Sequence, residues 1–433
     1  MTWETTPGTA AGASLATGQR SLGDPDLDFP LWPPLTAGCP RTSTADVSYP
    51  VELDYAYDQA DPARLFAPAG ATDGAPAGAT DGATDGAPAG ARGGLERWAP
   101  LLPPLLAPGL GEGATPMVEI RPGVHVKDES RNPTWSHKDR LNRCTTSAAV
   151  GVGAPGIAVA SSGNHGASAA AYAARAGLPC VVLTGPDTPP AVDAFLNAYG
   201  AVVLPVPWEA RWPLLRQVVE RLGLHPVSNL TTTHTGHPYG PEGYKTVAYE
   251  IFQDVGVPSA VFVPTGYGEL LFGVWKGFAE LRRLGLAERV PRIFSCESAA
   301  SGPLHRALAQ GLPAARLTVA PSDAYSIASP VSGYRGVVAV RGSGGRALTV
   351  SDTELADAQA ELARAGLWTE LSAAAGLAGL RSLGAQAPDD GPVVCVSTSS
   401  GFKDRGTGTH RTAPVAPEWA QVERRLRAAG LTG

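Results

Sequence analysis

Short apolar segments alternate with helix-like segments along most of this chain of 433 residues. The predicted strands cover residues 157–161, 180–184, 201–205, 260–264, 292–295 and 393–397. The predicted helices cover residues 167–176, 213–222, 244–253 and 269–284. Strands that alternate with helices along a sequence form a mostly parallel sheet. In such sheets, ligands bind in the loops that follow the carboxyl ends of the strands. The chain is therefore expected to have an α/β fold with its functional site in those loops.

The first 94 residues differ in composition from the rest of the chain. Residues 1–28 are rich in Gly, Thr, Ala and Asp without periodicity, which predicts a loosely ordered tail. Residues 47–55 alternate well enough to predict a short strand. Within residues 67–94, the sequence Ala-Thr-Asp-Gly-Ala-Pro-Ala-Gly occurs twice and contains no large apolar side chain. We therefore expect a flexible loop there, inside a poorly ordered N-terminal extension of residues 1–94.

Charge, hydropathy and cysteine spacing exclude several classes of protein. The net charge of −6 provides no basic surface for nucleic acid. The sequence has no apolar run long enough to cross a membrane and no secretory signal at its N-terminus. The cysteines have no C-x-x-C spacing, which argues against a disulfide framework and against a metal site; they are Cys39, Cys144, Cys180, Cys296 and Cys395. We expect a cytoplasmic protein without nucleic-acid or membrane partners.

Lysine is rare in this chain, and five of its 34 basic residues are lysines. A GC-rich genome would explain this depletion, but it does not explain where the remaining lysines lie. A desolvated lysine can form a Schiff base with a carbonyl, whereas arginine stays protonated and cannot. Lys138 has the most informative setting, and Lys127 and Lys276 are expected to have structural roles. The charge of Lys127 is expected to be balanced by Asp128 or Glu129.

Three loops that follow predicted strands are chemically distinctive. Residues 161–166 read Ser-Ser-Gly-Asn-His-Gly, and residues 265–269 read Thr-Gly-Tyr-Gly-Glu just before a predicted helix. Backbone N–H groups at such a helix start can bind a phosphate. Residues 397–401 present four hydroxyl groups. Each loop alone is more often an ordinary turn, so only their combination with Lys138 favours a ligand site.

The combined motifs resemble those of the fold-type-II pyridoxal-phosphate enzymes of the tryptophan synthase beta-like superfamily, and among them most closely the threonine synthases. The resemblance covers about residues 111–404. The motifs are Gly-Glu-Gly-Ala-Thr-Pro at 111–116, Asn-Pro-Thr-Trp-Ser-His-Lys-Asp-Arg at 132–140, Ala-Ser-Ser-Gly-Asn-His-Gly at 160–166, Glu-Gly-Tyr-Lys-Thr at 242–246, Val-Pro-Thr-Gly-Tyr-Gly at 263–268 and Gly-Phe-Lys-Asp at 401–404. Several motifs in the expected order make a chance match improbable.

The resemblance implies an architecture of two three-layer α/β domains, each rich in parallel sheet. The large cofactor-binding domain would consist of residues 95–150 and 236–433. Residues 151–235 would form a smaller inserted domain that closes over the substrate. The family also implies pyridoxal 5'-phosphate as the cofactor, an amino acid as the substrate and a homodimer.

The same resemblance implies roles for individual residues. Lys138 would bind the cofactor aldehyde as a Schiff base and act as the general base and acid. The other cofactor contacts would be Asn164 at the ring hydroxyl oxygen, Thr398 at the pyridine nitrogen, and the backbone of Gly266, Tyr267, Gly268, Glu269 and Leu270 at the phosphate. The substrate contacts would come from Ser161, Ser162, Gly163, His165 and His237.

The sequence departs from threonine synthases mainly where the substrate would bind. His137 replaces a phenylalanine before the lysine, and His165 replaces a threonine after the loop asparagine. An Asn-Pro-Tyr-Arg segment, whose arginine helps to bind the phosphate of O-phosphohomoserine, becomes His-Pro-Tyr-Gly at 237–240. Loss of that arginine is a large deficit unless another cation replaces it, and His165, His234 and His237 are candidates.

Three functions remain open at this stage. The first is a threonine synthase, which converts O-phosphohomoserine and water to threonine and phosphate. The second is a serine or threonine ammonia-lyase, or a β-replacement synthase of specialised metabolism. The third is a catalytically silent cofactor-binding protein, against which the combination of Lys138, Asn164 and Thr398 argues. A zinc ribbon, found at the N-terminus of many relatives, is not expected because Cys39 stands alone there.

Overall fold

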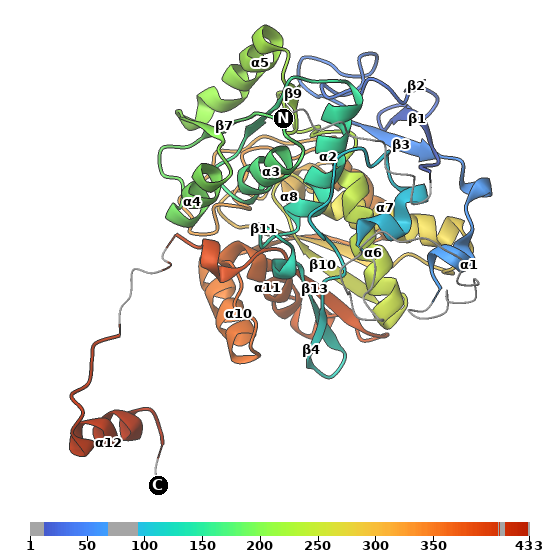
Figure 1. Cartoon of the computed structure of the whole chain (residues 1–433). Coiled ribbons are helices and arrows are strands. Elements are labelled where there is room, and N and C mark those ends of the chain that lie inside the picture. Colours follow the sequence, from blue (N-terminus) through green and yellow to red (C-terminus); the bar gives the residue numbers. More distant parts are fainter. Residues whose placement is uncertain (1–12, 68–93, 406, 408–411, 432–433) are drawn as a thin grey trace, which may run out of the picture.

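A computed structural model of the chain describes residues 13–67, 94–405, 407 and 412–431 (Figure 1). The repeat predicted to form a flexible loop lies outside these residues, as does most of the segment 67–94. No helix among the described residues is long and apolar enough to cross a membrane.

The larger sheet has six strands, and its spatial order places strands from both ends of the sequence side by side. Its order is β12-β11-β10-β13-β5-β4, and all neighbours are parallel except β4 and β5. The strands are β4 (Met117–Arg121), β5 (Val124–Asp128), β10 (Ala260–Pro264), β11 (Arg292–Ser298), β12 (Ala347–Val350) and β13 (Val393–Ser397). The predicted strands 260–264, 292–295 and 393–397 are thus neighbours in this sheet.

Helices cover both faces of this sheet and give it three layers. Side chains alternate across β10, so Val261 and Val263 face one apolar cluster while Phe262 faces the other. The first cluster includes α6 (Gly240–Val255), α7 (Glu269–Arg283), α8 (Pro303–Ala309) and α9 (Tyr334–Ser343). The second includes α10 (Asp352–Arg364) and α11 (Ala375–Ser382). Burial on both faces explains why β10 is apolar at every position.

A second sheet has four parallel strands in the order β8-β7-β6-β9. The strands are β6 (Ile157–Ala160), β7 (Cys180–Thr184), β8 (Val202–Pro205) and β9 (His225–Pro226). The helices α3 (Asn164–Arg175) and α4 (Pro190–Ala198) share one apolar cluster with this sheet, and α5 (Arg211–Leu222) shares another. These elements all lie within residues 151–235, although the exact domain boundaries stay a prediction.

Helix α2 (Lys138–Gly151) lies between the two sheets (Figure 1). It packs against α6, which covers the larger sheet, and against α3, which covers the smaller sheet. Its first residue is Lys138, so the fold places this lysine where the two α/β units meet. The loops after β6, β10 and β13 lie at the carboxyl ends of their strands. This is the arrangement that the alternating sequence pattern predicts.

The described part of the N-terminal extension is ordered. Strands β1 (Ala16–Ser21), β2 (Asp28–Pro30) and β3 (Val51–Tyr55) form an antiparallel sheet, and α1 (Pro62–Leu65) follows them. Prediction of a loose tail through residue 28 was therefore wrong for β1, where pairing with β3 outweighs weak local propensity. Leu53 and Tyr55 pack against Cys144 and Tyr239, so the extension completes the core around α2 and α6. Near the C-terminus, α12 (Trp419–Ala428) has no buried residue.

Candidate active site

The predicted site residues come from loops that hydrogen-bond to one another. The backbone N–H of His137 donates to the carbonyl of Thr398 at 3.0 Å, which joins the start of α2 to the loop after β13. The hydroxyl of Ser399 in that loop donates to Asn164 Oδ1 at 3.1 Å, at the start of α3. Three chain segments far apart in the sequence therefore meet at Lys138.

Lys138 differs from the other four lysines in its surroundings. Lys127, Lys245 and Lys276 form buried ion pairs, and Lys403 donates to the carbonyl of Thr134. Among the described residues, the Lys138 ammonium has no hydrogen bond or ion pair, and it lies 5.7 Å from the centre of the Tyr244 ring. Burial lowers the pKa of Lys138, although Glu269 opposes that shift. The neutral, nucleophilic amine is therefore more populated than in a solvated lysine.

The expected partners of Lys127 were wrong. Its ammonium pairs with Glu250 at 2.7 Å and donates to the carbonyl of Thr115 at 2.6 Å, instead of pairing with Asp128 or Glu129. Glu250 lies on α6 and is remote in the sequence, so local charge spacing could not identify it. Lys276 pairs with Glu242 at 2.8 Å and with Glu52 at 3.2 Å, which agrees with the structural role expected for it.

His137 links Lys138 to the loop after β13. Its Nδ1 lies 3.0 Å from the carbonyl oxygen of Thr398, so Nδ1 carries a hydrogen and donates it. The ring stacks on Tyr244 with centroids 5.4 Å apart. Burial lowers the pKa of His137 well below its ordinary value, and the nearby Lys138 adds to that effect. A neutral ring can stack here much as phenylalanine would, while the hydrogen bond to Thr398 is an added contact.

The loop between β10 and α7 has the geometry of a phosphate-binding helix start. Gly268 has φ of +91°, and a Cβ there would lie 3.1 Å from the Cα of Gly336. That position therefore suits glycine because of both its conformation and its close approach to a neighbouring backbone. Helix α7 begins at Glu269, where N–H groups of the first turn have no partner within the helix. These N–H groups and the helix dipole favour an anion.

The Glu269 side chain lies against the segment that precedes α6. Its Oε2 is 3.9 Å from His234 Nε2, and a Cβ on Gly236 would lie 2.0 Å from its Oε1. Within the part of the chain that the structure describes, Glu269 Oε1 is buried without a hydrogen-bond partner. Burial raises the pKa of Glu269, although Lys138 and Arg335 oppose that shift. A partly protonated carboxyl group is therefore accessible closer to neutral pH than for a solvated glutamate.

Asn164 is held on both sides of its amide by residues of the larger sheet's loops. Its Nδ2 donates to a carboxylate oxygen of Glu370 at 2.8 Å, while Ser399 donates to its Oδ1. Glu370 also accepts a hydrogen bond from the hydroxyl of Ser326. This arrangement fixes which way the amide faces and leaves one N–H of Asn164 for a ligand. Sequence reasoning missed Glu370, because a single acidic residue between two helices carries no local signal.

The predicted substrate residues differ in what remains free on their side chains. Ser161 Oγ accepts from the N–H of Gly163 at 3.2 Å, and Ser162 Oγ accepts from the N–H of Gly185. His165 Nε2 is buried without a hydrogen-bond partner among the described residues, so it is available to a ligand.

His237 is less available than His165. Its Nδ1 accepts from the N–H of Tyr239 at 3.0 Å, so its Nε2 carries the hydrogen, which points to His225 Nε2 at 2.8 Å. Both nitrogens of His237 are therefore engaged within the protein. The role of His237 as a substrate contact stays a prediction, and these two hydrogen bonds argue against it.

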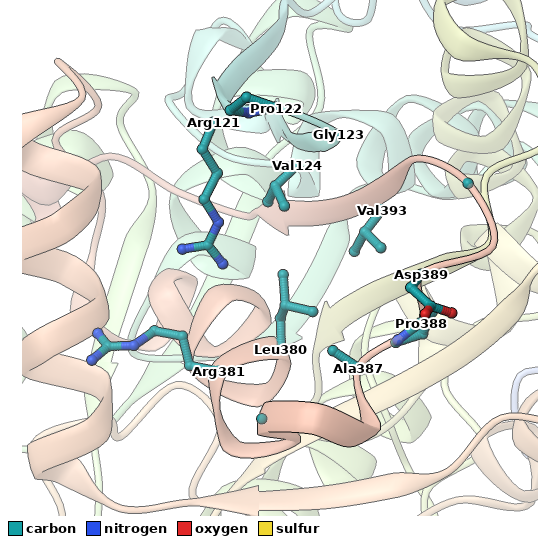
Figure 2. Close-up of a pocket in the computed structure, with 12 residues that line it drawn as sticks. Arg121, Pro122, Gly123, Val124, Leu380, Arg381, Ala387, Pro388, Asp389 and Val393 are labelled. Carbon is teal, nitrogen blue, oxygen red and sulfur yellow. The ribbon is translucent and has the colours of Figure 1, made fainter.

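A surface pocket of about 520 Å³ lies near the first residues of β5 and β13 (Figure 2). These are the amino ends of the two strands, whereas the candidate site loops follow carboxyl ends. The pocket is lined by Arg121, Arg381 and Asp389 among others, and by none of the predicted site residues. Both arginines pair with Glu361, at 2.9 and 3.5 Å. Because both arginines already pair with Glu361, this pocket offers less reactive chemistry than the loops around Lys138.

The Glu370 contact gives a first testable prediction. Replacing Glu370 with alanine removes the charged acceptor that orients Asn164, so we expect affinity for pyridoxal phosphate to fall about 10-fold. Glu370→Gln keeps an acceptor of the same size and should lose less. Titration of the visible absorbance of the bound cofactor measures both affinities. Equal affinity in the alanine variant and the unchanged enzyme would show that Glu370 does not position Asn164.

Together, these groups fit pyridoxal phosphate. Lys138 provides an unpaired amine, the start of α7 provides a phosphate cradle, and Asn164 retains one amide N–H. The fold and site define an enzyme that uses this cofactor. A family model described as "Pyridoxal-phosphate dependent enzyme" matches residues 109–399, and the chain belongs to that family. It is a pyridoxal-phosphate-dependent lyase of the fold-type-II class.

Similar proteins include a threonine synthase from Methanosarcina acetivorans. It is 33% identical over 333 residues, which cover 72% of this chain and 80% of the relative. Among solved structures, the processed form of threonine deaminase isoform 2 from Solanum lycopersicum has a TM-score of 0.57 and 18% identity over 73% of this chain and 84% of that one. Maize serine racemase has a TM-score of 0.57 and 20% identity over 73% and 94%. The two structural matches establish the fold alone.

Proposed function

We propose that this lyase is a threonine synthase that converts O-phosphohomoserine and water to threonine and phosphate. The observation that carries the proposal is the unpaired amine of Lys138 between the Asn164 loop and the helix start at Glu269. The similarity to the threonine synthase of Methanosarcina acetivorans, which covers most of both chains, supports this choice of reaction.

Lys138 has two tasks in this proposal. Its amine would hold the cofactor through the cofactor aldehyde, and with substrate bound the same amine would take the proton from the substrate α-carbon. Burial lowers the pKa of Lys138, which favours the neutral form required for both tasks. Bound pyridoxal phosphate supplies an electron sink for the charge that remains on the substrate carbon.

The surrounding residues hold the cofactor and control its charge. The backbone N–H groups from Gly266 to Leu270 would bind its phosphate, and the free N–H of Asn164 would donate to its ring oxygen. The hydroxyl of Thr398 would lie at the pyridine nitrogen. A hydroxyl cannot keep that nitrogen protonated as a carboxylate would, so the ring is a milder electron sink. This favours elimination and replacement over transamination.

The loop after β6 orients the substrate. We expect the backbone N–H groups of Ser161, Ser162 and Gly163 to bind the α-carboxylate, and Nε2 of His165 to contact a polar substrate group. Residues 151–235 act as the unit that closes over the substrate, which excludes water from the reactive carbanion. We also expect the enzyme to be a homodimer.

A second candidate function is a serine or threonine ammonia-lyase, or a β-replacement synthase. Gly240 favours it, because threonine synthases carry an arginine at this position that binds the substrate phosphate. An enzyme without a cation for that phosphate would act on amino acids with an uncharged leaving group.

Product analysis with the purified, cofactor-loaded enzyme separates the two candidates. With O-phosphohomoserine, we expect equal amounts of threonine and inorganic phosphate. Serine, threonine and O-phosphoserine serve as comparison substrates. Rapid release of ammonia and a 2-oxo acid from serine or threonine, without threonine formation from O-phosphohomoserine, would favour the second candidate.

A further inference from the structure

Arg335 is a buried cation whose hydrogen bonds are incomplete. It is the second residue of α9, and 2% of its surface is exposed. Its Nη2 donates to the carbonyl of Val51 at 2.6 Å, whereas Nε and Nη1 are buried without a partner among the described residues. Buried donors on a charged group are costly when they stay unpaired. A ligand from outside this chain would resolve that cost.

Arg335 belongs to the wall of the candidate active site. A Cβ on Gly268 in the phosphate-binding loop would lie 3.1 Å from Gly336, the residue after Arg335. A Cβ on Gly333, at the start of α9, would lie 3.3 Å from the carbonyl oxygen of Tyr267. The Arg335 guanidinium lies 5.8 Å from the ring centre of Phe272 in the first turn of α7. Helix α9 therefore begins directly against the loop expected to bind the cofactor phosphate.

Glu269 interacts electrostatically with both Arg335 and Lys138. Both cations act on its carboxyl group through charge, yet neither lies within the 4.0 Å of an ion pair with it among the described residues. Its Oε1 also lacks a hydrogen-bond partner in the described ranges of the chain. Lys138, Glu269 and Arg335 thus interact through charge, and each has hydrogen-bonding atoms without a partner among the described residues. Once Lys138 is attached to the cofactor, Arg335 remains as a cation that acts on Glu269.

The neighbouring histidines do not provide an alternative cation. Burial lowers the pKa of His165, His234 and His237 well below its ordinary value in each case, and nearby positive charges add to this effect. They are therefore neutral at pH 7. In addition, His234 stacks on Tyr267 with centroids 4.2 Å apart, and both nitrogens of His237 are engaged.

We propose that Arg335 binds the phosphate-ester leaving group of the substrate and thereby replaces the arginine that is absent at Gly240. Glu269 opposes this anion when it is ionised, so it sets how tightly the phosphate is held before and after it leaves. The assignment rests on the proposed function for the identity of the substrate. The same guanidinium chemistry would also suit the cofactor's own phosphate, and the experiment separates these two sources.

Binding of inorganic phosphate to the cofactor-loaded enzyme tests the assignment, because the cofactor's phosphate site is then filled. Equilibrium dialysis with labelled phosphate gives its Kd, and cofactor absorbance gives the Kd of pyridoxal phosphate. We expect Arg335→Gln to weaken phosphate binding about 10- to 100-fold and to change cofactor affinity less than about 3-fold. Arg335→Lys should lie between the two. Unchanged phosphate affinity would overturn the proposal, and an equal loss of cofactor affinity would assign Arg335 to the cofactor phosphate.

Glu269→Gln supplies an independent test with the opposite sign. Removing the carboxylate charge should tighten phosphate binding. This measurement therefore tests the proposal even if Arg335→Gln does not fold. Weaker or unchanged phosphate binding in Glu269→Gln would contradict the proposal. Neither readout requires turnover. If serine proves to be the substrate while Arg335→Gln still loses phosphate, the anion subsite stands and the proposed function fails.

Discussion

Lys138→Ala is expected to lower the rate of the elimination or replacement reaction by about 10³-fold or more. In the proposed function, Lys138 supplies both the amine that attaches the cofactor and the base that moves the α-proton, and the variant would lose both. Among the described residues, no other lysine can take its place, because Lys127, Lys245 and Lys276 are held in ion pairs and Lys403 is bound to the carbonyl of Thr134. The visible absorbance of the lysine-bound cofactor should disappear with the activity.

Chemical trapping locates the attachment independently of the rate. Borohydride reduction of the loaded enzyme followed by trypsin should give a modified peptide of residues 132–140, uncleaved after Lys138 because its amine is alkylated. Lys138→Arg is the matched control, since it keeps a positive charge but cannot form the bond to the cofactor. Modification of a peptide containing Lys403, or normal activity in Lys138→Ala, would contradict the assignment.

Much of the parallel sheets could be predicted from the sequence because several buried strands are short apolar segments, whereas β5 contains the buried, charged Lys127 and Asp128 and was not among the predicted strands. Residues 180–184 and 393–397, for example, coincide with β7 and β13. The strand β1 could not, since Ala16–Ser21 is polar and is stabilised as a strand by its pairing with β3. Local pattern therefore identifies segments that are buried on both faces better than segments whose structure depends on a remote partner.

The candidate site divides in the same way. Lys138, Asn164 and the glycines of the phosphate-binding loop lie in recognisable motifs directly after strands or at helix starts. Glu370 and Arg335 do not lie in such motifs, because the contacts that suggest their roles are with residues remote in the sequence. Asn164 and Glu370 are 206 residues apart, and Arg335 and Val51 are 284 residues apart. Motifs can thus identify the groups that we propose to contact the cofactor, whereas the fold is needed to identify the groups that we propose to orient them or to complete the substrate site.

Arg140, two residues after Lys138, forms buried ion pairs that hold the start of α2 in place. It pairs with Glu129 at 2.7 Å and with Glu250 at 2.6 Å, and all three side chains are at most 1% exposed. Burial raises the pKa of Glu250, but Arg140 and Lys127 outweigh this effect and hold that pKa below its ordinary value. The Glu250 carboxylate therefore stays ionised inside the protein as long as its cations are present.

Arg140→Met should remove about 3–5 kcal/mol of stability, because it leaves Glu129 without its cation and Glu250 with only Lys127. The apparent melting temperature should fall by about 5 °C. Arg121→Met is the matched control, since Arg121 pairs with Glu361 at 2.9 Å but is 44% exposed; we expect a loss of about 1 kcal/mol or less. Cofactor affinity should fall only in Arg140→Met, because the same network positions Lys138. Equal melting shifts in both variants would mean that burial adds nothing to the Arg140 pairs, and the start of α2 would then depend on apolar packing alone.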